Sequence, residues 1–150
     1  MEDSGRAGIV RASFDLTVDG ARTIVRQVVD RADGAHRGVS VAVVDSAGVM
    51  LAFERMDGAL RFSADLALAK ARTAAAFGRA TAEMEATFHD RPVFAHSFVL
   101  QGGWYLGRGG FPLLVDGRSA GGVGVSGDDA EFEERLALDA AEWVRARVDD

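Results

Sequence analysis

VSVAVVDSAGVMLAFERMDG, residues 39–58, holds the pattern that decides the fold. Two apolar runs, Val39–Val44 and Val49–Phe53, flank Asp45-Ser46-Ala47-Gly48, a cluster of turn-forming residues. Paired runs around such a cluster predict a β-hairpin. The first run is apolar at nearly every position, which is typical of a strand covered on both faces.

On either side of this hairpin, the sequence predicts a second hairpin, four helices and a loop. Leu113–Val115, the type I′ turn dipeptide Asp116-Gly117 and Arg118–Ser126 predict a second hairpin. Helical spacing and capping residues predict four helices, over residues 15–35, 63–77, 81–89 and 129–148. Their expected N-caps are Thr17 or Asp19, Ser63, Thr81, and Asp128 or Asp129. Residues 93–112 contain five glycines between 102 and 110 and are expected to form a loop that Pro92 introduces.

Because hairpins rather than crossovers join the strands, the expected fold class is α+β, with an antiparallel sheet flanked by helices. The length of 150 residues fits a single domain, here residues 15–150, after a flexible N-terminus at residues 1–14. Seven alanines between residues 64 and 76 permit the second helix to pack closely against a sheet or a sister helix.

The composition excludes several classes of protein. A net charge of −6 with dispersed arginines argues against a nucleic-acid partner. The absence of cysteine removes disulfides and thiolate metal sites. The sequence has neither an apolar run of the roughly 18 residues that a membrane span needs nor a secretory signal, so we expect a cytoplasmic protein with no membrane partner.

Two groups of polar residues could bind a ligand. Arg55 is suited to a carboxylate or phosphate, with Asp57 to orient it. The alternative is an ion pair at the strand end between Arg55 and Asp57 or Asp45. Lys70 is the only lysine among the 17 basic residues, and Thr73 lies three positions further along the same helix face. The alternative for Lys70 is a solvated side chain on an exposed face.

The three histidines differ in their surroundings. His36 and His89 are expected at the surface, whereas His96 lies between Phe94 and Phe98. His96 is therefore the candidate metal ligand, as the axial ligand of a haem, or a general base, and a structural role is the alternative. The glycine-rich segment matches neither the Walker A nor the Rossmann pattern.

In combination, three blocks of sequence carry a resemblance: SVAVVDSAGVMLAFERMDGA, KARTAAAF and GGFPLLVDGRSAGGVGVSG, in this order. They resemble the GlcG/HbpS-like family of haem-binding proteins and the C-terminal domain of PduO-type corrinoid adenosyltransferases, over residues 16–148. The resemblance implies a profilin-like sheet flanked by helices, a homo-oligomer of two or more copies, and binding of haem or a related tetrapyrrole. The family's motif positions fall here on Asp45, Arg55, Asp57, Lys70, Gly109, Gly110 and Pro112.

The chain departs from the family pattern in a compact acidic segment at residues 128–134 and in the aromatic pair Trp104-Tyr105. We therefore retain three hypotheses. The first is a binder of haem or a similar planar ligand, the second a small pathway enzyme, and the third an accessory protein that self-associates through the alanine-rich helix 63–77.

In the binder, the expected ligand contacts come from Asp45, Thr73, Phe94, Phe98, Trp104, Gly109, Gly110 and Phe111, with His96 at the metal. In the enzyme, Arg55 and Lys70 anchor an anionic or carbonyl substrate, and Asp57 or His96 transfers the proton. Both hypotheses require a cavity where Arg55, Lys70 and Gly109 converge.

Overall fold

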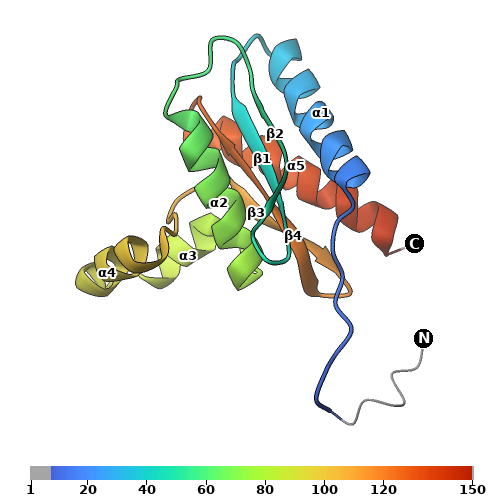
Figure 1. Ribbon diagram of the computed structural model, residues 1–150. Helices are drawn as coiled ribbons and strands as arrows, with labels where there is room; N and C mark the ends of the chain where they lie inside the picture. The colour runs from blue at the N-terminus through green and yellow to red at the C-terminus, as the bar shows by residue number, and fades with distance from the viewer. Residues whose placement is uncertain (1–7, 150) are drawn as a thin grey trace.

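The computed structural model describes residues 8–149. Its elements, in chain order, are α1 (Val18–Gly34), β1 (Ser40–Asp45), β2 (Met50–Arg55), α2 (Ser63–Phe77), α3 (Thr81–Thr87), α4 (Pro92–Gly102), β3 (Gly110–Val115), β4 (Arg118–Ser126) and α5 (Ala130–Val148). The four strands form one antiparallel sheet in the order β2-β1-β4-β3. α1 and α5 cover one face and α2 covers the other (Figure 1). The predicted α+β class and single antiparallel sheet are confirmed.

Strand alternation sends large residues to one face of the sheet. Val41, Val43, Val123 and Val125 are fully buried against α1 and α5, and Ile24 of α1 packs on them. β1 runs through the middle of the sheet and is buried on both faces, as its unbroken apolar sequence predicts.

Glycines occupy the opposite face where α2 crosses the sheet. A side chain on Gly124 would collide with the carbonyl oxygen of Ala67, and one on Gly122 with that of Ala71. Only glycine therefore lets this helix lie so close to β4. Ala67 and Ala71 are fully buried in this contact. The alanine-rich face of α2 packs against the chain's own sheet, so the expectation that it mediates self-association is wrong.

Turn-forming and capping residues correctly predicted the turn between β3 and β4 and the starts of α1 and α5. Asp116 and Gly117 have φ values of 49° and 72°, the left-handed pair that a type I′ turn requires. The Thr17 side chain accepts a hydrogen bond from the Gly20 N–H at 3.0 Å, and Asp129 accepts one from the Phe132 N–H at 2.9 Å. Of the predicted alternatives, Thr17 rather than Asp19 caps α1, and Asp129 rather than Asp128 caps α5.

Two predicted caps are wrong because their hydroxyls bind other elements. The Ser63 Oγ lies 2.8 Å from the Ser40 Oγ of β1, and α2 begins without a side-chain cap. The Thr81 Oγ1 accepts the Gly110 N–H at 3.0 Å. Both hydroxyls are fully buried and join a helix to the sheet.

The predicted loop at residues 93–112 is also partly wrong. Pro92 starts α4, because proline is tolerated in the first turn of a helix, where its missing N–H is not needed. The glycines begin only at Gly102, and Gly103 ends the helix in the left-handed conformation with a φ of 65°. Residues 110–112 belong to β3. Residues 1–7 of the predicted flexible N-terminus lie outside the described residues, and residues 10–17 form neither helix nor strand.

A buried ion pair joins the two helical layers. The Lys70 ammonium of α2 donates to the Val125 carbonyl oxygen of β4 and to the Glu133 carboxylate of α5, each at 2.8 Å. The lysine passes beside Gly109, where an added Cβ would lie 3.0 Å from the ammonium nitrogen and 2.7 Å from the Val125 oxygen. Since α2 and α5 lie on opposite faces, this pair connects them just before β3 begins.

No helix within residues 8–149 is long and apolar enough to cross a membrane.

The close approach of α2 generates one prediction. Gly124→Ala should lower the free energy of unfolding by at least the roughly 1–3 kcal/mol typical of overpacking, because the new methyl group collides with backbone. Urea unfolding followed by circular dichroism measures this loss. Gly34→Ala is the matched control, because no atom lies within 4 Å of its added Cβ, and it should be neutral or slightly stabilising. Equal stability of the two variants would contradict the packing argument.

The ion pair generates a second prediction. Lys70→Met should destabilise the protein by about 3–5 kcal/mol, because it leaves the Glu133 carboxylate buried without its cation. Adding Glu133→Gln should recover part of this loss. Arg31→Met is the control: the Arg31–Asp139 pair, 2.7 Å long, is partly exposed and should contribute about 0–1 kcal/mol. If thermal unfolding showed an equally small loss of stability for Lys70→Met and Arg31→Met, the Lys70–Glu133 pair would not be what holds the two helical layers together.

Candidate functional site

Lys70 is covered rather than presented to a ligand. Its side chain is 2% exposed, and the Tyr105 ring centroid lies 5.1 Å from the ammonium nitrogen. Burial lowers the pKa of Lys70, and the Glu133 carboxylate opposes this decrease. Burial also raises the pKa of Tyr105, with a further contribution from the charge of Glu133. The lone lysine is therefore a buried ion-pair partner, and its predicted alternative of a solvated side chain is also wrong.

Thr73 and Gly110 lie near Lys70, and their polar groups are bonded within the chain. The Thr73 Oγ1 donates to the Ala69 carbonyl oxygen and accepts the Tyr105 N–H, both at 2.8 Å. Thr73 thus holds the segment before β3 against α2. The Gly110 N–H donates a hydrogen bond to the Thr81 Oγ1. The structure brings Lys70, Thr73, Gly109 and Gly110 together as predicted, but through packed internal contacts.

Arg55 does not join this group. It ends β2 at one edge of the sheet, whereas Gly109 leads into β3 at the other edge. Three strand spacings of about 4.8 Å separate the two edges, or about 14 Å. Arg55 therefore does not converge with Lys70 and Gly109, and the expected cavity between the three is wrong. Both hypotheses lose this site: the enzyme hypothesis loses its anchor pair, and a binder must place its ligand elsewhere on the chain.

The other two predicted carboxylates, Asp45 and Asp57, lie on either side of β2 in the chain. The Asp45 Oδ1 accepts the N–H groups of Ala47 and Val49, each at 2.9 Å, and so shapes the first hairpin turn. Asp57 is exposed in the loop after β2. Within residues 8–149, Arg55 forms an ion pair with neither Asp45 nor Asp57, so the alternative of a strand-end ion pair is wrong as well.

Aromatic side chains gather between α4 and the rest of the molecule. Phe98 lies 5.4 Å from Phe77, 5.2 Å from Phe88 and 6.1 Å from Trp104, measured between ring centroids. Phe94 extends this aromatic cluster on the same helix. Phe111, in contrast, packs on the core under α5. Three of the four predicted aromatic contacts are thus brought together.

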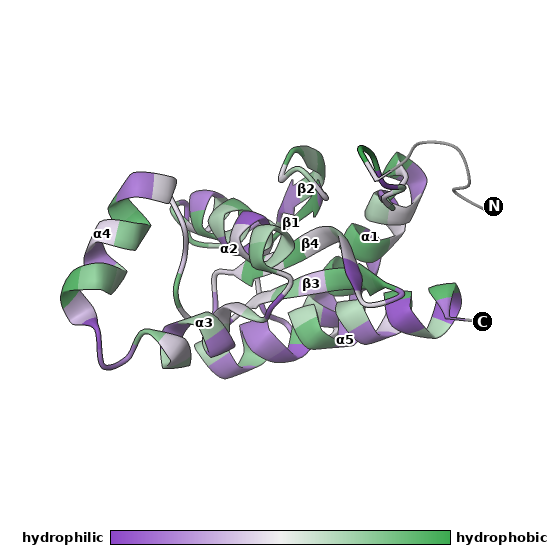
Figure 2. Ribbon diagram, turned by 90° about the horizontal axis from the view of Figure 1, so that it is seen from below, coloured by the Kyte–Doolittle hydropathy of each residue, from purple (hydrophilic) through white to green (hydrophobic). Residues whose placement is uncertain are grey.

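α4 stands away from the sheet and its covering helices (Figures 1 and 2). None of its residues is buried, and its sequence PVFAHSFVLQG contains no charged residue. Val93, His96 and Leu100 follow the i, i+3, i+7 spacing of one helix face, and this outer stripe is distinct from the side of Phe94 and Phe98. Val93 is 83% exposed and Leu100 is 70% exposed.

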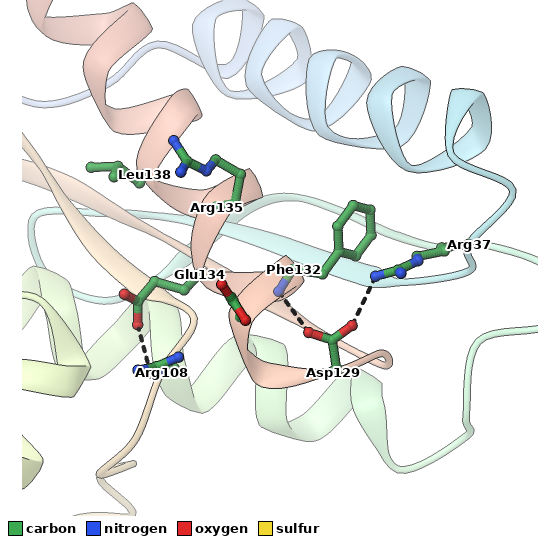
Figure 3. A pocket seen from close by; sticks show the side chains of 8 residues that line it. Arg37, Arg108, Asp129, Phe132, Glu134, Arg135 and Leu138 are labelled. Atoms are coloured by element: carbon green, nitrogen blue, oxygen red, sulfur yellow. Dashed lines mark hydrogen bonds and ion pairs between the residues drawn. The ribbon is translucent and has the colours of Figure 1, made fainter.

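A cavity of about 520 Å³ lies at the start of α5 (Figure 3). Arg37 binds Asp129 at 2.8 Å, and its guanidinium lies 4.5 Å from the Phe132 ring centroid. Arg108 lies 3.5 Å from Glu134 on the opposite side. Arg37 and Arg108 are thus paired with carboxylates, whereas Arg135, which also lines the cavity, forms no ion pair within residues 8–149.

Sequence reasoning missed Glu133 as a functional partner, although the acidic segment that contains it was noted. The available signal was chemical: a lysine within an apolar helix face needs a buried carboxylate. Glu133 meets this need through its Oε2, which accepts from the Lys70 ammonium at 2.8 Å. Its Oε1 accepts the Gly127 and Asp128 N–H groups at 2.8 and 3.0 Å, so both oxygens are hydrogen-bonded. No group of three or more potential metal-ligating His, Asp or Glu side chains occurs in the described part of the chain.

Comparison with known proteins adds an independent finding. The family model described as "Haem degrading protein HbpS-like" matches residues 16–142. Protein GlcG of Escherichia coli strain K12 is 36% identical over 107 residues, which span 71% of this chain and 77% of GlcG. Corrinoid adenosyltransferase PduO of Salmonella typhimurium is 34% identical over 118 residues, 78% of this chain but only 35% of PduO.

Solved structures agree with this assignment. The crystal structure of HbpS superposes with a TM-score of 0.82 at 31% identity, covering 93% of this chain and 97% of HbpS. The crystal structure of a PduOC:heme complex gives a TM-score of 0.77 at 32% identity, covering 85% of this chain and 94% of the solved one. The matched residues include the two hairpins and the lysine-bearing helix on which the resemblance was based. This chain is a member of the HbpS-like family.

Proposed function

We propose that this protein binds haem or a related planar tetrapyrrole on the outer stripe of α4, with His96 as the axial ligand. The observation that carries the proposal is the position of His96 between two exposed apolar side chains on an uncharged helix. Val93 lies one turn before it and Leu100 one turn after it. A planar apolar ligand centred on the imidazole would cover both.

The surroundings of His96 suit this role. The residue is exposed, and its imidazole makes no hydrogen bond within residues 8–149, so a ring nitrogen is available to an iron atom. Arg91 precedes the helix, with its guanidinium 4.2 Å from the Phe94 ring centroid. It forms no ion pair with a carboxylate of the described residues, and it would pair with an acidic substituent at the rim of the ligand.

The comparisons support the ligand class. The family description names haem, and the solved PduOC relative is a haem complex. The aromatic cluster behind α4 supports the same reading, because it holds an otherwise isolated helix in place. When bound, the haem would supply the iron chemistry, while this chain would supply the axial imidazole, the apolar contact surface and the cation.

Titration with haemin tests the proposal. The wild-type protein should give a saturable shift of the Soret band. His96→Ala should weaken haemin binding by about tenfold or more, equivalent to about 1.4 kcal/mol, and should alter the bound spectrum because the axial ligand is lost.

His36→Ala and His89→Ala are matched controls, since both histidines are exposed and lie outside α4. Both should bind haemin like the wild type. Circular dichroism should show that all three variants fold normally. Unchanged affinity and spectrum in His96→Ala would exclude His96 as the ligand, and the absence of any saturable shift in the wild type would exclude haem binding altogether.

A further inference from the structure

One face of α5 lines the cavity at the start of this helix (Figure 3). Its residues Glu131, Glu134, Arg135 and Leu138 follow the i, i+3, i+4, i+7 spacing of a single helix face. The volume of about 520 Å³ lies in the range of small-molecule pockets, and the described lining includes no residue of α4. The cavity is therefore a second candidate site, separate from the outer stripe of α4.

The backbone N–H groups at the start of α5 are already bonded within the chain. The Asp129 side chain accepts the Phe132 N–H at 2.9 Å. The Glu133 carboxylate accepts the N–H groups of Gly127 and Asp128. These bonds leave the recognition of a ligand to the side chains that line the cavity.

Arg135 is the cation that remains for a ligand. Arg37 is held by Asp128 and Asp129, at 3.1 and 2.8 Å. Arg135 is exposed and has no carboxylate of the described residues within ion-pair distance. Even Glu131, which lies one turn before it at the spacing of a helical ion pair, is not paired with it. An unpaired guanidinium of this kind fits the two oxygens of a ligand carboxylate.

Glu134 is the acceptor that remains for a ligand. Its Oε2 is buried and accepts no hydrogen bond in the described part of the chain. The Arg108 Nε approaches this oxygen to 3.5 Å, but without the geometry of a hydrogen bond. A buried carboxylate oxygen without a donor is unfavourable. Because Arg108 is half exposed and forms no other ion pair with a described residue, it can move aside for an ammonium group that donates to Glu134.

We propose that this cavity binds an α-amino acid with an apolar side chain. The ligand carboxylate pairs with Arg135, its ammonium group donates to Glu134, and its side chain contacts Leu138, one turn further along the same helix face. Three arginines and three carboxylates are among the described residues that line the cavity, so their formal charges cancel. A zwitterion matches such a site. A simple anion would leave Glu134 without a donor, and a simple cation would leave Arg135 without an acid.

Isothermal titration calorimetry with matched probes tests the ligand class. L-leucine carries both charges, 4-methylpentanoate lacks the ammonium group, and 3-methylbutylamine lacks the carboxylate. L-leucine should bind saturably, with one molecule per chain, and each analogue should bind about tenfold more weakly or worse. The absence of saturable heat with L-leucine would overturn the proposal, and so would an equal affinity for either analogue.

Substitutions on α5 test the position of the site. Arg135→Gln and Glu134→Gln should each weaken L-leucine binding by about tenfold or more, because each removes one charged partner of the ligand. Arg145→Gln and Glu142→Gln are the matched controls, since both residues lie on the same helix outside this cavity, and they should bind like the wild type. Circular dichroism should show that all four variants fold normally. Unchanged affinity in the first two variants, or an equal loss in the controls, would contradict the site.

Arg108→Gln distinguishes a zwitterion from an anion as the ligand. If Arg108 only covers Glu134, its removal should leave L-leucine bound at least as tightly as in the wild type. A loss of about tenfold or more would show that Arg108 itself holds the ligand. That result would overturn the assignment of the ammonium group to Glu134.

Discussion

The Lys70–Glu133 ion pair is the interaction on which the rest of the structure depends. A buried ammonium is tolerated only when its charge and its hydrogen bonds are satisfied, and this one is held by a carbonyl and a carboxylate. Gly109 must then lack a side chain, because the lysine passes beside it. The second oxygen of Glu133 binds the N–H groups of Gly127 and Asp128, so the same pair also fixes the turn into α5. The buried charge of Lys70 thus requires a carboxylate at position 133 and a glycine at position 109.

The second constraint is the distance between α2 and the sheet. Gly122 and Gly124 let the helix backbone approach β4, and alanines fill the contact. Together with the ion pair, this packing fills the interior at the positions where a ligand cavity was expected. The haem site that we propose accordingly lies at the periphery of the fold, on α4. Lys70, one of the motif positions, is bonded within the chain, whereas His96 lies outside the sequence blocks that carry the resemblance.

Local sequence signals predicted the local structure well. The hairpin at residues 39–55, the helix at Ser63–Phe77 and the Asp116-Gly117 turn each depend on neighbouring residues, and all are found. Contacts distant in sequence were not predictable in this way. Lys70 and Glu133 lie 63 positions apart, and Ser63 and Thr81 bind residues of other elements instead of capping helices. α4 was missed because five glycines dominate the segment, although all of them lie at or beyond the end of the helix.

The distribution of large side chains accounts for the exposed apolar surface beside α4. The buried core consists mainly of alanine, valine and a few larger aliphatic residues, and none of the nine phenylalanines is buried in the described structure. A core built on glycine and alanine contacts has no room for aromatic rings, so these rings lie toward the surface. Phe111 and Phe132 pack against the outside of the core, and Phe77, Phe88, Phe94 and Phe98 form the aromatic cluster behind α4. Such surface lowers the free energy only when something covers it. Because α4 stands away from the sheet (Figures 1 and 2), a planar ligand could cover its outer stripe without disturbing the packing of the core.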